Sequence, residues 1–343
     1  MINQLMKLLS FLHYKLTLKK LLSFLHYKLL KLLRPFLQSS GFYETDFKRK
    51  LYKGFFNFIQ ILTGRKKFLY SGKKSLINHV CFEMPWLSSL FQQGYVLIHN
   101  EKLPHEFMDI HEKTIQIALD IANNQNLIFA SPSKNYLHRA DLSKLPWETI
   151  NSLYRYFTHP IFLETAEIYL GDQPLLTELK VLVSPPNHSS ELEGSQLWHS
   201  DFDDSTNLKI FVFLDDIDWD CGPLQAVPKY DSSVFMRDIG YKWGVVNISH
   251  NDLNVPETYT KPMSFVGSQG TICLIDTVSC LHRGSRHPKR PRKILYATYN
   301  TRTSFRFIPW NWIGLRHKIN SGSSPLIALD PELRFLDSNA LNI

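Results

Sequence analysis

The chain has 343 residues, of which 44% are hydrophobic and 20% charged, a composition typical of a globular protein with a substantial core. Its net charge of +8 is concentrated: residues 1–75 contain 16 lysines and arginines but only two acids, so this segment carries +14 and the other 268 residues carry −6. The basic charge therefore belongs to the first segment, and the rest gives no reason to expect nucleic acid as a partner.

The basic segment contains an identical ten-residue repeat, Lys7–Leu16 and Lys20–Leu29. Leucine, phenylalanine and lysine at these spacings are typical of a basic helix that lies in a membrane interface. The offset between the copies turns an ideal helix by about 220° beyond whole turns, so they face different directions in one straight helix. Three hypotheses stay open: peripheral membrane association through residues 1–40, a helix that packs on the rest of the protein, and a local duplication without a role.

Targeting signals are weak in this sequence. Lysines interrupt the long apolar stretches of the basic segment, which argues against a membrane-spanning helix, and no small-residue cleavage site follows an apolar run. A transit peptide stays open, because the segment has almost no acids. The four cysteines form no CxxC pair and no disulfide framework, which favours a reducing compartment. We therefore predict a cytoplasmic protein, with or without association to a membrane surface.

Helical patterns dominate the chain before the strands. Phe47–Ser75 mixes aromatic residues with basic clusters and predicts one or two surface helices. Leu103–Gln125 is predicted to be helical, because apolar residues recur at helical intervals before Asn123 and Asn124. Trp147–Leu170 is predicted to be a further helical region. We expect these helices to lie outside a β core.

Four apolar runs rich in β-branched and aromatic residues follow, bounded by turn-forming or polar residues. Antiparallel strands of this kind, which leave and return to one pocket, predict a jelly roll, or double-stranded β-helix. The predicted fold class is mainly β with flanking helices (α+β) around a cupin-like core. The four predicted strands are Leu179–Val183, Leu208–Leu214, Thr271–Asp276 and Lys293–Tyr299.

His199-Ser200-Asp201 and the distant His282 are the candidate metal ligands. Residues i and i+2 of a strand point to the same face, so His199 and Asp201 can grip one ion while Ser200 turns away. His282 comes just beyond the third predicted strand. Two imidazoles and one carboxylate can occupy one face of an octahedral Fe(II) ion and leave three positions open for a chelating co-substrate and oxygen, which argues for an oxygenase.

The stretch from about Phe91 to Arg292 resembles the phytanoyl-CoA dioxygenase family of Fe(II)- and 2-oxoglutarate-dependent oxygenases. Four pieces in the family's order carry the resemblance: its first strand, its HxD pair, its "NGPL…vPGSH" turn and its "D…HrGS…R" segment. In this chain they are Phe91–Ile98, His199–Asp201, Cys221–Pro228 and Asp276–Arg292.

The resemblance implies that His199, Asp201 and His282 are the catalytic iron ligands. It also implies Fe(II), 2-oxoglutarate and O2 as cofactor and co-substrates, ascorbate as a candidate reductant, and succinate and CO2 as products. Related halogenases vacate the position of Asp201 for chloride, so the carboxylate in this chain favours hydroxylation.

The last of these pieces implies a clamp for the distal carboxylate of 2-oxoglutarate. Arg292 is the candidate, because it abuts the fourth predicted strand as the family's arginine does, and a planar guanidinium can bind a carboxylate through two hydrogen bonds. Arg290, two residues earlier, is the rival. Ser285 is a further candidate contact to the co-substrate.

The sequence does not identify the substrate. Pro228–Ser232 replaces the family's "PGSH" residues, and residues 229–265 are expected to shape the substrate entrance. Trp198, Phe202 and Tyr299 are candidates for the pocket lining, although packing in the core is the more ordinary role for Trp198 and Tyr299.

We therefore predict three parts: a basic amphipathic extension (1–75), an oxygenase domain (76–320) and a C-terminal tail (321–343). The predicted function is hydroxylation of a small or lipid-like molecule, with desaturation or epimerisation as other reactions of the same site. The alternative is a non-catalytic cupin-like binding protein, or a membrane-surface protein with a structural metal site. The open ligand positions and Arg292 favour the enzyme.

Overall fold

The computed structural model describes residues 45–62, 84–131, 134–172, 174–187, 191–243, 261–286, 288–301 and 304. The repeat within residues 1–40, residues 244–260 of the predicted substrate entrance and the predicted tail at 321–343 lie outside these ranges. No helix among the described residues has the length and apolar character needed to cross a bilayer.

Within the described ranges, the strands form one sheet of seven and one of three, with antiparallel pairing throughout. The long neighbours β4 and β10 lie near the middle of the larger sheet. Its order is β1 (Tyr95–Ile98), β8 (Ile272–Ile275), β5 (Asn207–Phe213), β10 (Arg292–Asn300), β4 (Leu175–Ser184), β3 (Lys134–Ala140) and β2 (Ile128–Ser131). The smaller sheet has the order β7 (Met263–Ser264), β6 (Gln225–Ala226) and β9 (His282–Arg283).

The connections between these strands make a jelly roll. After β4 the chain passes His199, which pairs with the edge strand β9 of the smaller sheet, and returns to the larger sheet in β5. It then takes β6 and β7 in the smaller sheet, β8 in the larger, β9 in the smaller and β10 in the larger. This exchange of antiparallel strands between two sheets confirms the predicted fold class.

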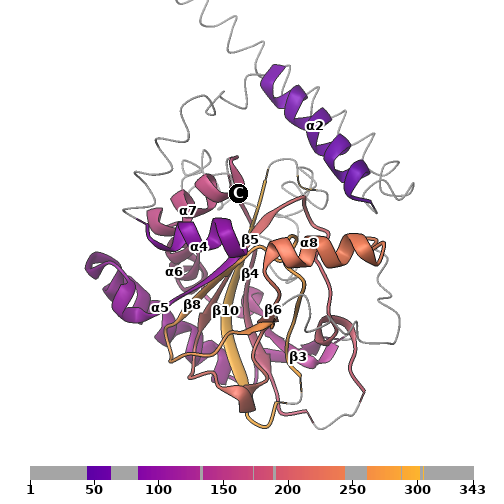
Figure 1. The fold of residues 1–343 in the computed structure, drawn as a ribbon. Helices are drawn as coiled ribbons and strands as arrows, with labels where there is room; N and C mark the ends of the chain where they lie inside the picture. Colours follow the sequence, from indigo (N-terminus) through magenta and orange to yellow (C-terminus); the bar gives the residue numbers. More distant parts are fainter. Residues whose placement is uncertain are drawn as a thin grey trace, which may run out of the picture.

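Helices cover one face of the larger sheet, and the smaller sheet lies on the other side with α8 beside it (Figure 1). The covering helices α4, α5, α6 and α7 contribute to one apolar cluster with the strands. The helices are α2 (Asp46–Leu62), α4 (Trp86–Gln93), α5 (His105–Asn123), α6 (Trp147–Phe157), α7 (Pro160–Leu170) and α8 (Lys229–Asp238), with 3-10 turns at Asn100–Lys102, Leu142–Lys144, Gly194–Gln196 and Trp219–Cys221.

Two predicted boundaries need correction. The helical region Trp147–Leu170 is two helices, because Pro160 has no N–H to continue α6 and the His159 ring instead accepts a hydrogen bond from the backbone N–H of Ile161 at the start of α7. The predicted first strand Phe91–Ile98 is wrong over its first three residues, which end α4. Gly94 closes that helix in the left-handed conformation, with φ 82°, so the strand begins at Tyr95.

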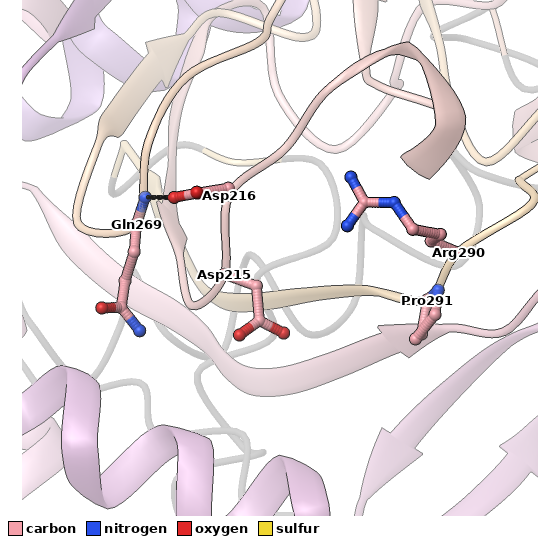
Figure 2. A pocket seen from close by; sticks show the side chains of 5 residues that line it. All are labelled: Asp215, Asp216, Gln269, Arg290 and Pro291. Atoms are coloured by element: carbon pink, nitrogen blue, oxygen red, sulfur yellow. Dashed lines mark hydrogen bonds between the residues drawn. The ribbon is translucent and has the colours of Figure 1, made fainter.

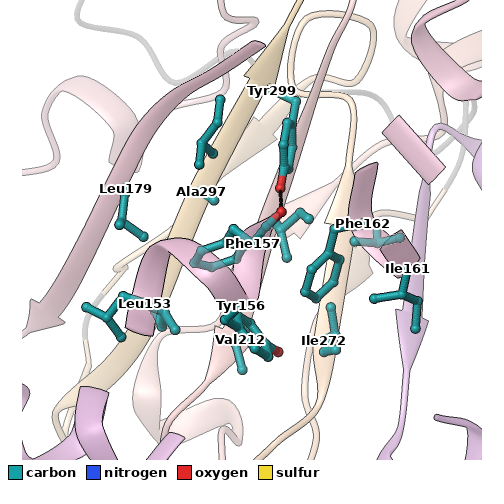
Figure 3. Close-up of a cluster of buried hydrophobic side chains, with 14 of the residues drawn as sticks. Leu153, Tyr156, Phe157, Ile161, Phe162, Leu179, Val212, Ile272, Ala297 and Tyr299 are labelled. Atoms are coloured by element: carbon teal, nitrogen blue, oxygen red, sulfur yellow. Dashed lines mark hydrogen bonds between the residues drawn. The ribbon is translucent and has the colours of Figure 1, made fainter. Parts of the chain in front are cut away.

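The strands present different chemistry on their two faces. Along β10, Leu295, Ala297 and Tyr299 face the helices, where Tyr299 donates a hydrogen bond to the carbonyl of Phe157 (Figure 3). Tyr296, on the opposite face, packs with the cluster between the sheets. Tyr299 is therefore a core residue of the helix-covered face. This confirms the packing role that the sequence favoured over pocket lining, because Tyr299 lies one strand position out of phase with the pocket face.

Phe157 tests the contribution of this helix-covered core. The side chain is fully buried at the end of α6 and contacts the aromatic rings of Tyr156 and Phe162. Phe157→Ala is expected to lower the free energy of unfolding by about 3–5 kcal/mol, because it removes buried apolar surface and leaves a cavity. Urea unfolding measures the change. Tyr230→Ala, at a side chain that is 73% exposed, is the control and should stay within about 0.5 kcal/mol of the natural chain.

Candidate metal centre

His199, Asp201 and His282 meet at the edge of the smaller sheet. The backbone N–H of His199 donates to the carbonyl of His282 at 3.1 Å, and the N–H of His282 donates back at 2.9 Å. Nε2 of His199 lies 4.0 Å from Oδ1 of Asp201, and Nε2 of His282 lies 3.8 Å from Oδ2. The structure thus brings together the three residues that the sequence singled out.

Both imidazoles have their free nitrogen directed to the centre. Nδ1 of His199 lies 2.8 Å from the carbonyl oxygen of Leu197, and Nδ1 of His282 lies 3.1 Å from that of Cys280. A carbonyl can only accept a hydrogen bond, so each Nδ1 carries the proton. The Nε2 lone pairs are then available to a metal ion, and the carbonyls fix the orientation of the rings.

The protonation states also suit a cation. Burial lowers the pKa of both imidazoles, that of His282 to about 3, so the rings are neutral near pH 7. Burial raises the pKa of Asp201, but the Lys209 ammonium together with His282 and His199 outweighs this and holds the pKa well below its usual range. Nζ of Lys209 lies 2.5 Å from Oδ2 of Asp201. Two neutral imidazoles and a carboxylate are the forms that bind metal.

The donors of the three side chains lie close together without yet having the spacing of metal ligands. Ligands on one face of an octahedral ion, each about 2.1 Å from it, lie about 3 Å apart. The two imidazole–carboxylate distances are longer than this, and the chosen donor atoms of all three residues lie within 4.8 Å of one another. The nitrogen and oxygen atoms therefore have to move closer together to share one divalent ion.

Asp276 holds the turn that delivers His282. Its buried carboxylate accepts hydrogen bonds from the backbone N–H groups of Val278 and Ser279 and from the hydroxyls of Thr206 and Tyr169. These bonds join the end of β8 to the start of β5 and to α7. The resemblance pointed to Asp276 as part of a motif, and the structure shows that it fixes the path of the chain between β8 and β9.

Ser200 turns away from the centre, as the spacing of residues i and i+2 predicts. Its hydroxyl donates to the carbonyl of Val278 at 2.6 Å and accepts from the indole of Trp243 at 3.0 Å. The guanidinium of Arg49 on α2 stacks 4.7 Å from the same indole ring. Helix α2 is thereby connected to the backbone of the metal ligands.

Arg292 is a buried cation at the start of β10. It is 6% exposed, and its guanidinium donates to the carbonyl of Gly222 at 2.7 Å and to the hydroxyls of Ser285 at 2.6 Å and Ser184 at 3.4 Å. No carboxylate pairs with it among the described residues, and its Nε is buried without a partner. Burial lowers the pKa of Arg292 to about 10, so it stays charged near neutral pH. Neutral acceptors therefore hold a positive charge that an anion can balance.

Arg290 lies outside this environment. Its guanidinium is 53% exposed and forms an ion pair with Asp218. Figure 2 shows it at a surface pocket together with two carboxylates, which makes that pocket a poor site for a second anion. The pocket is lined by Asp215, Asp216, Gln269, Arg290 and Pro291.

The two remaining candidates for the pocket lining, Trp198 and Phe202, differ in their burial. Trp198 is 2% exposed and packs with Val227 and Leu281, while the guanidinium of Arg283 stacks 4.3 Å from its ring. It is a core residue, which confirms the packing role that the sequence favoured over pocket lining, because the strand alternation turns it away from the metal. Phe202 is half-buried, next to Asp201.

Sequence reasoning missed a group of three charged residues and one tyrosine on the inner face of the larger sheet. Glu178 and Lys180 on β4, Lys209 on β5 and Tyr296 on β10 lie on this face. A signal was present: Glu178 and Lys180 are two positions apart inside an apolar strand, the spacing that puts two charges on one face.

No family model matches this sequence, and no curated protein does either. Solved structures are similar to it over about two thirds of its length. The epimerase SnoN, in complex with Fe3+, alpha ketoglutarate and nogalamycin RO, has a TM-score of 0.45 and 18% identity over 67% of this chain and 88% of its own. EctD from S. alaskensis, with 2-oxoglutarate and 5-hydroxyectoine, has a TM-score of 0.42 and 16% identity over 63% and 75%. AviO1 from Streptomyces viridochromogenes Tue57 has a TM-score of 0.42 and 14% identity over 64% and 96%.

The ion pair between Asp201 and Lys209 can be tested by measuring the stability of the metal-free protein. Asp201→Ala is expected to lower the free energy of unfolding by on the order of 3 kcal/mol, because the Lys209 ammonium, 11% exposed, loses its counter-ion. The double variant Asp201→Ala/Lys209→Met should recover part of this loss, and urea unfolding measures both. Asp109→Ala removes one partner of an exposed ion pair with Lys113 and should cost less than about 1 kcal/mol. Equal losses in the single and double variants would contradict the pairing.

Proposed function

We propose that this protein is an Fe(II)- and 2-oxoglutarate-dependent dioxygenase that hydroxylates a small organic molecule. The observation that carries the proposal is an open three-ligand metal centre in the same jelly roll as Arg292, a buried arginine without an anionic partner among the described residues. Structural metal sites are usually closed by four protein ligands, whereas catalytic sites keep positions open. Together with the resemblance to the phytanoyl-CoA dioxygenase family, these features favour a metal enzyme with a dicarboxylate co-substrate.

In this proposal His199, His282 and one oxygen of Asp201 hold the iron. Bound Fe(II) and 2-oxoglutarate supply the oxidising chemistry, in which O2 is consumed, succinate and CO2 are released and a substrate C–H bond is hydroxylated. The carbonyls of Leu197 and Cys280 orient the two imidazoles. The protein's contribution is thus a fixed, preorganised ligand geometry.

Arg292 binds the distal carboxylate of 2-oxoglutarate in this proposal. The contacts with Gly222 and Ser285 hold the plane of its guanidinium in place. The Nε–H group and part of the hydrogen-bonding capacity of the terminal nitrogens are left for the ligand. The hydroxyl of Ser285, which also contacts Ser184, is a further candidate contact to the same carboxylate. Ser285 and His282 are close in sequence, so one short segment links the clamp to the metal.

The alternative function is a non-catalytic cupin-like protein with a structural metal. The three-ligand centre and the charge of Arg292, which no carboxylate among the described residues balances, argue against it, because both leave binding capacity that a purely structural site does not need. Membrane association through residues 1–40 is a separate prediction, since that segment lies outside the described residues.

Succinate release tests the enzyme. Full-length protein with Fe(II), ascorbate, O2 and 2-oxoglutarate is expected to form succinate above a protein-free control, and His199→Ala should return it to the control level, because two ligands hold the iron poorly. His105→Ala, at an exposed position of α5, is the matched control and should behave as the natural chain.

Turnover without the true substrate can be slow, so binding provides the second measurement. Calorimetry under nitrogen should detect 2-oxoglutarate binding to Fe(II)-loaded protein and its loss in His199→Ala. Absence of both succinate and binding in the natural chain, or equal values in the two proteins, would reject the proposed function.

The two arginines give a paired test of the clamp. Arg292→Ala is expected to weaken 2-oxoglutarate binding by about 10- to 100-fold, the effect of losing charge-assisted hydrogen bonds. Arg290→Ala should leave the affinity unchanged, because its guanidinium pairs with Asp218 at the surface. Calorimetry on Fe(II)-loaded protein measures both, and circular dichroism checks that each variant is folded. The opposite ranking would assign the clamp to Arg290.

A further inference from the structure

Helix α2 carries an apolar stripe on the surface of the molecule. The stripe consists of Phe47, Leu51, Phe55 and Phe58, whose side chains are 75%, 55%, 46% and 56% exposed. Their spacing places them within about 80° of one another on a helix that turns by about 100° per residue. They are half of the large apolar side chains that are exposed among the described residues. Such a contiguous patch is typical of a surface that contacts a partner or a membrane.

The opposite face of α2 is polar and is bound to the rest of the protein. The guanidinium of Arg49 donates a hydrogen bond to the backbone carbonyl of Asp204, and the ammonium of Lys53 donates to the buried carboxylate of Asp204. That carboxylate also accepts from the backbone N–H of Thr301, next to β10. An ordinary surface helix buries its apolar face, so the polarity of α2 is reversed. The contacts of Arg49 and Lys53 hold the stripe outward, at the periphery of the molecule (Figure 1).

Lysines border the apolar stripe along both of its edges. At about 100° per residue, Lys48 lies about 20° beyond one edge and Lys50 about 60° beyond the other. Lys50 is exposed and Lys48 is half-buried. A lysine stem can lie along an apolar surface while its ammonium reaches the polar head groups of lipids. An apolar centre with basic edges is typical of helices that lie in a membrane interface.

The chain on both sides of α2 has the same sign of charge. Residues 1–45 contain seven lysines and arginines against one acid, Glu44, and residues 63–75 contain five without any acid. The negative surface of an anionic bilayer attracts such basic segments. A second copy of this chain would instead bring another +14 to the same place, so like-charge repulsion disfavours self-association through α2. Charge complementarity therefore favours anionic lipid as the partner of the stripe.

We infer that α2 is a membrane-docking helix whose apolar stripe inserts into the surface of an anionic phospholipid bilayer, while the lysines at its edges contact the head groups. This inference does not depend on the proposed function. It differs from association through residues 1–40, because α2 is fastened to the jelly roll. Arg49 stacks on Trp243, whose indole donates to Ser200 between two metal-ligand candidates. Docking through α2 thus places this segment on the side of the protein that faces the bilayer.

Vesicle co-sedimentation of the full-length protein tests this surface. Vesicles of phosphatidylcholine and phosphatidylserine are expected to bind the protein more tightly than phosphatidylcholine alone, and added salt should weaken the binding. Leu51→Gln/Phe58→Gln should weaken it at least about tenfold, because two apolar side chains no longer leave water, and Phe47→Gln should act in the same direction. Glutamine keeps the helix propensity. Trp219→Gln, at an aromatic side chain that is 68% exposed outside α2, is the matched control and should bind as the natural chain does.

Several results would overturn the inference. Equal binding of the stripe variants and the natural chain would assign the vesicle contact to other residues, such as the repeat within 1–40. Equal binding to both kinds of vesicle would reject an anionic surface as the partner. Absence of vesicle binding would reject membrane docking altogether. A dimer in sedimentation velocity that the stripe variants abolish would then assign the stripe to a second copy, and a monomer would leave a partner protein.

Urea unfolding without vesicles checks that the stripe is a surface of the folded protein. Leu51→Gln/Phe58→Gln should unfold at the same urea concentration as the natural chain, because both side chains are exposed. A clear loss of stability would show that the stripe packs within the protein and would reject docking. Succinate release is measured in solution, so the dioxygenase and the docking helix can each fail without the other.

Discussion

The reciprocal backbone hydrogen bonds between His199 and His282 are the contact on which the site depends. They join two segments that are far apart in the chain and set both imidazole-bearing Cα atoms opposite each other across an antiparallel bridge. Residues paired in this way point to the same face, so the two rings approach to a centroid distance of 4.1 Å. The neighbouring carbonyls of Leu197 and Cys280 can then fix the tautomers. The jelly roll positions the site because it makes these two segments neighbours.

The strand period of two gives the larger sheet its two roles. Leu295, Ala297 and Tyr299 bury one face of β10 under the helices, while Arg292 and Tyr296 stand on the other face. The helix-covered face supplies apolar burial, which is the main stabilising contribution to the fold. That stability offsets the cost of keeping charged side chains half-buried on the inner face. Fold and site are therefore two faces of the same strands.

The inner face carries more charge than its own partners balance. Asp201 and Lys209 satisfy each other, and Glu178 satisfies Lys180, but among the described residues Arg292 is held by carbonyl and hydroxyl oxygens and by no carboxylate. Removing a cation from water costs free energy that neutral acceptors recover only in part. A protein that keeps such a group gains most when an anion binds, and this is the physical basis for the dicarboxylate co-substrate that we propose.

The sequence by itself determined the three metal-ligand candidates and the four long strands, because ligand type, residue spacing and apolar periodicity are local properties. It favoured Arg292 over Arg290 by position alone and could not show that the two differ in burial, and it could not fix which strand face Trp198 and Tyr299 would occupy. Lys209 reads as a lysine within an apolar strand, and only the folded chain sets it against Asp201. The burial of each arginine, the surroundings of each strand face and the partner of Lys209 all depend on contacts between segments that are distant in the chain. Such contacts exist only in the folded protein.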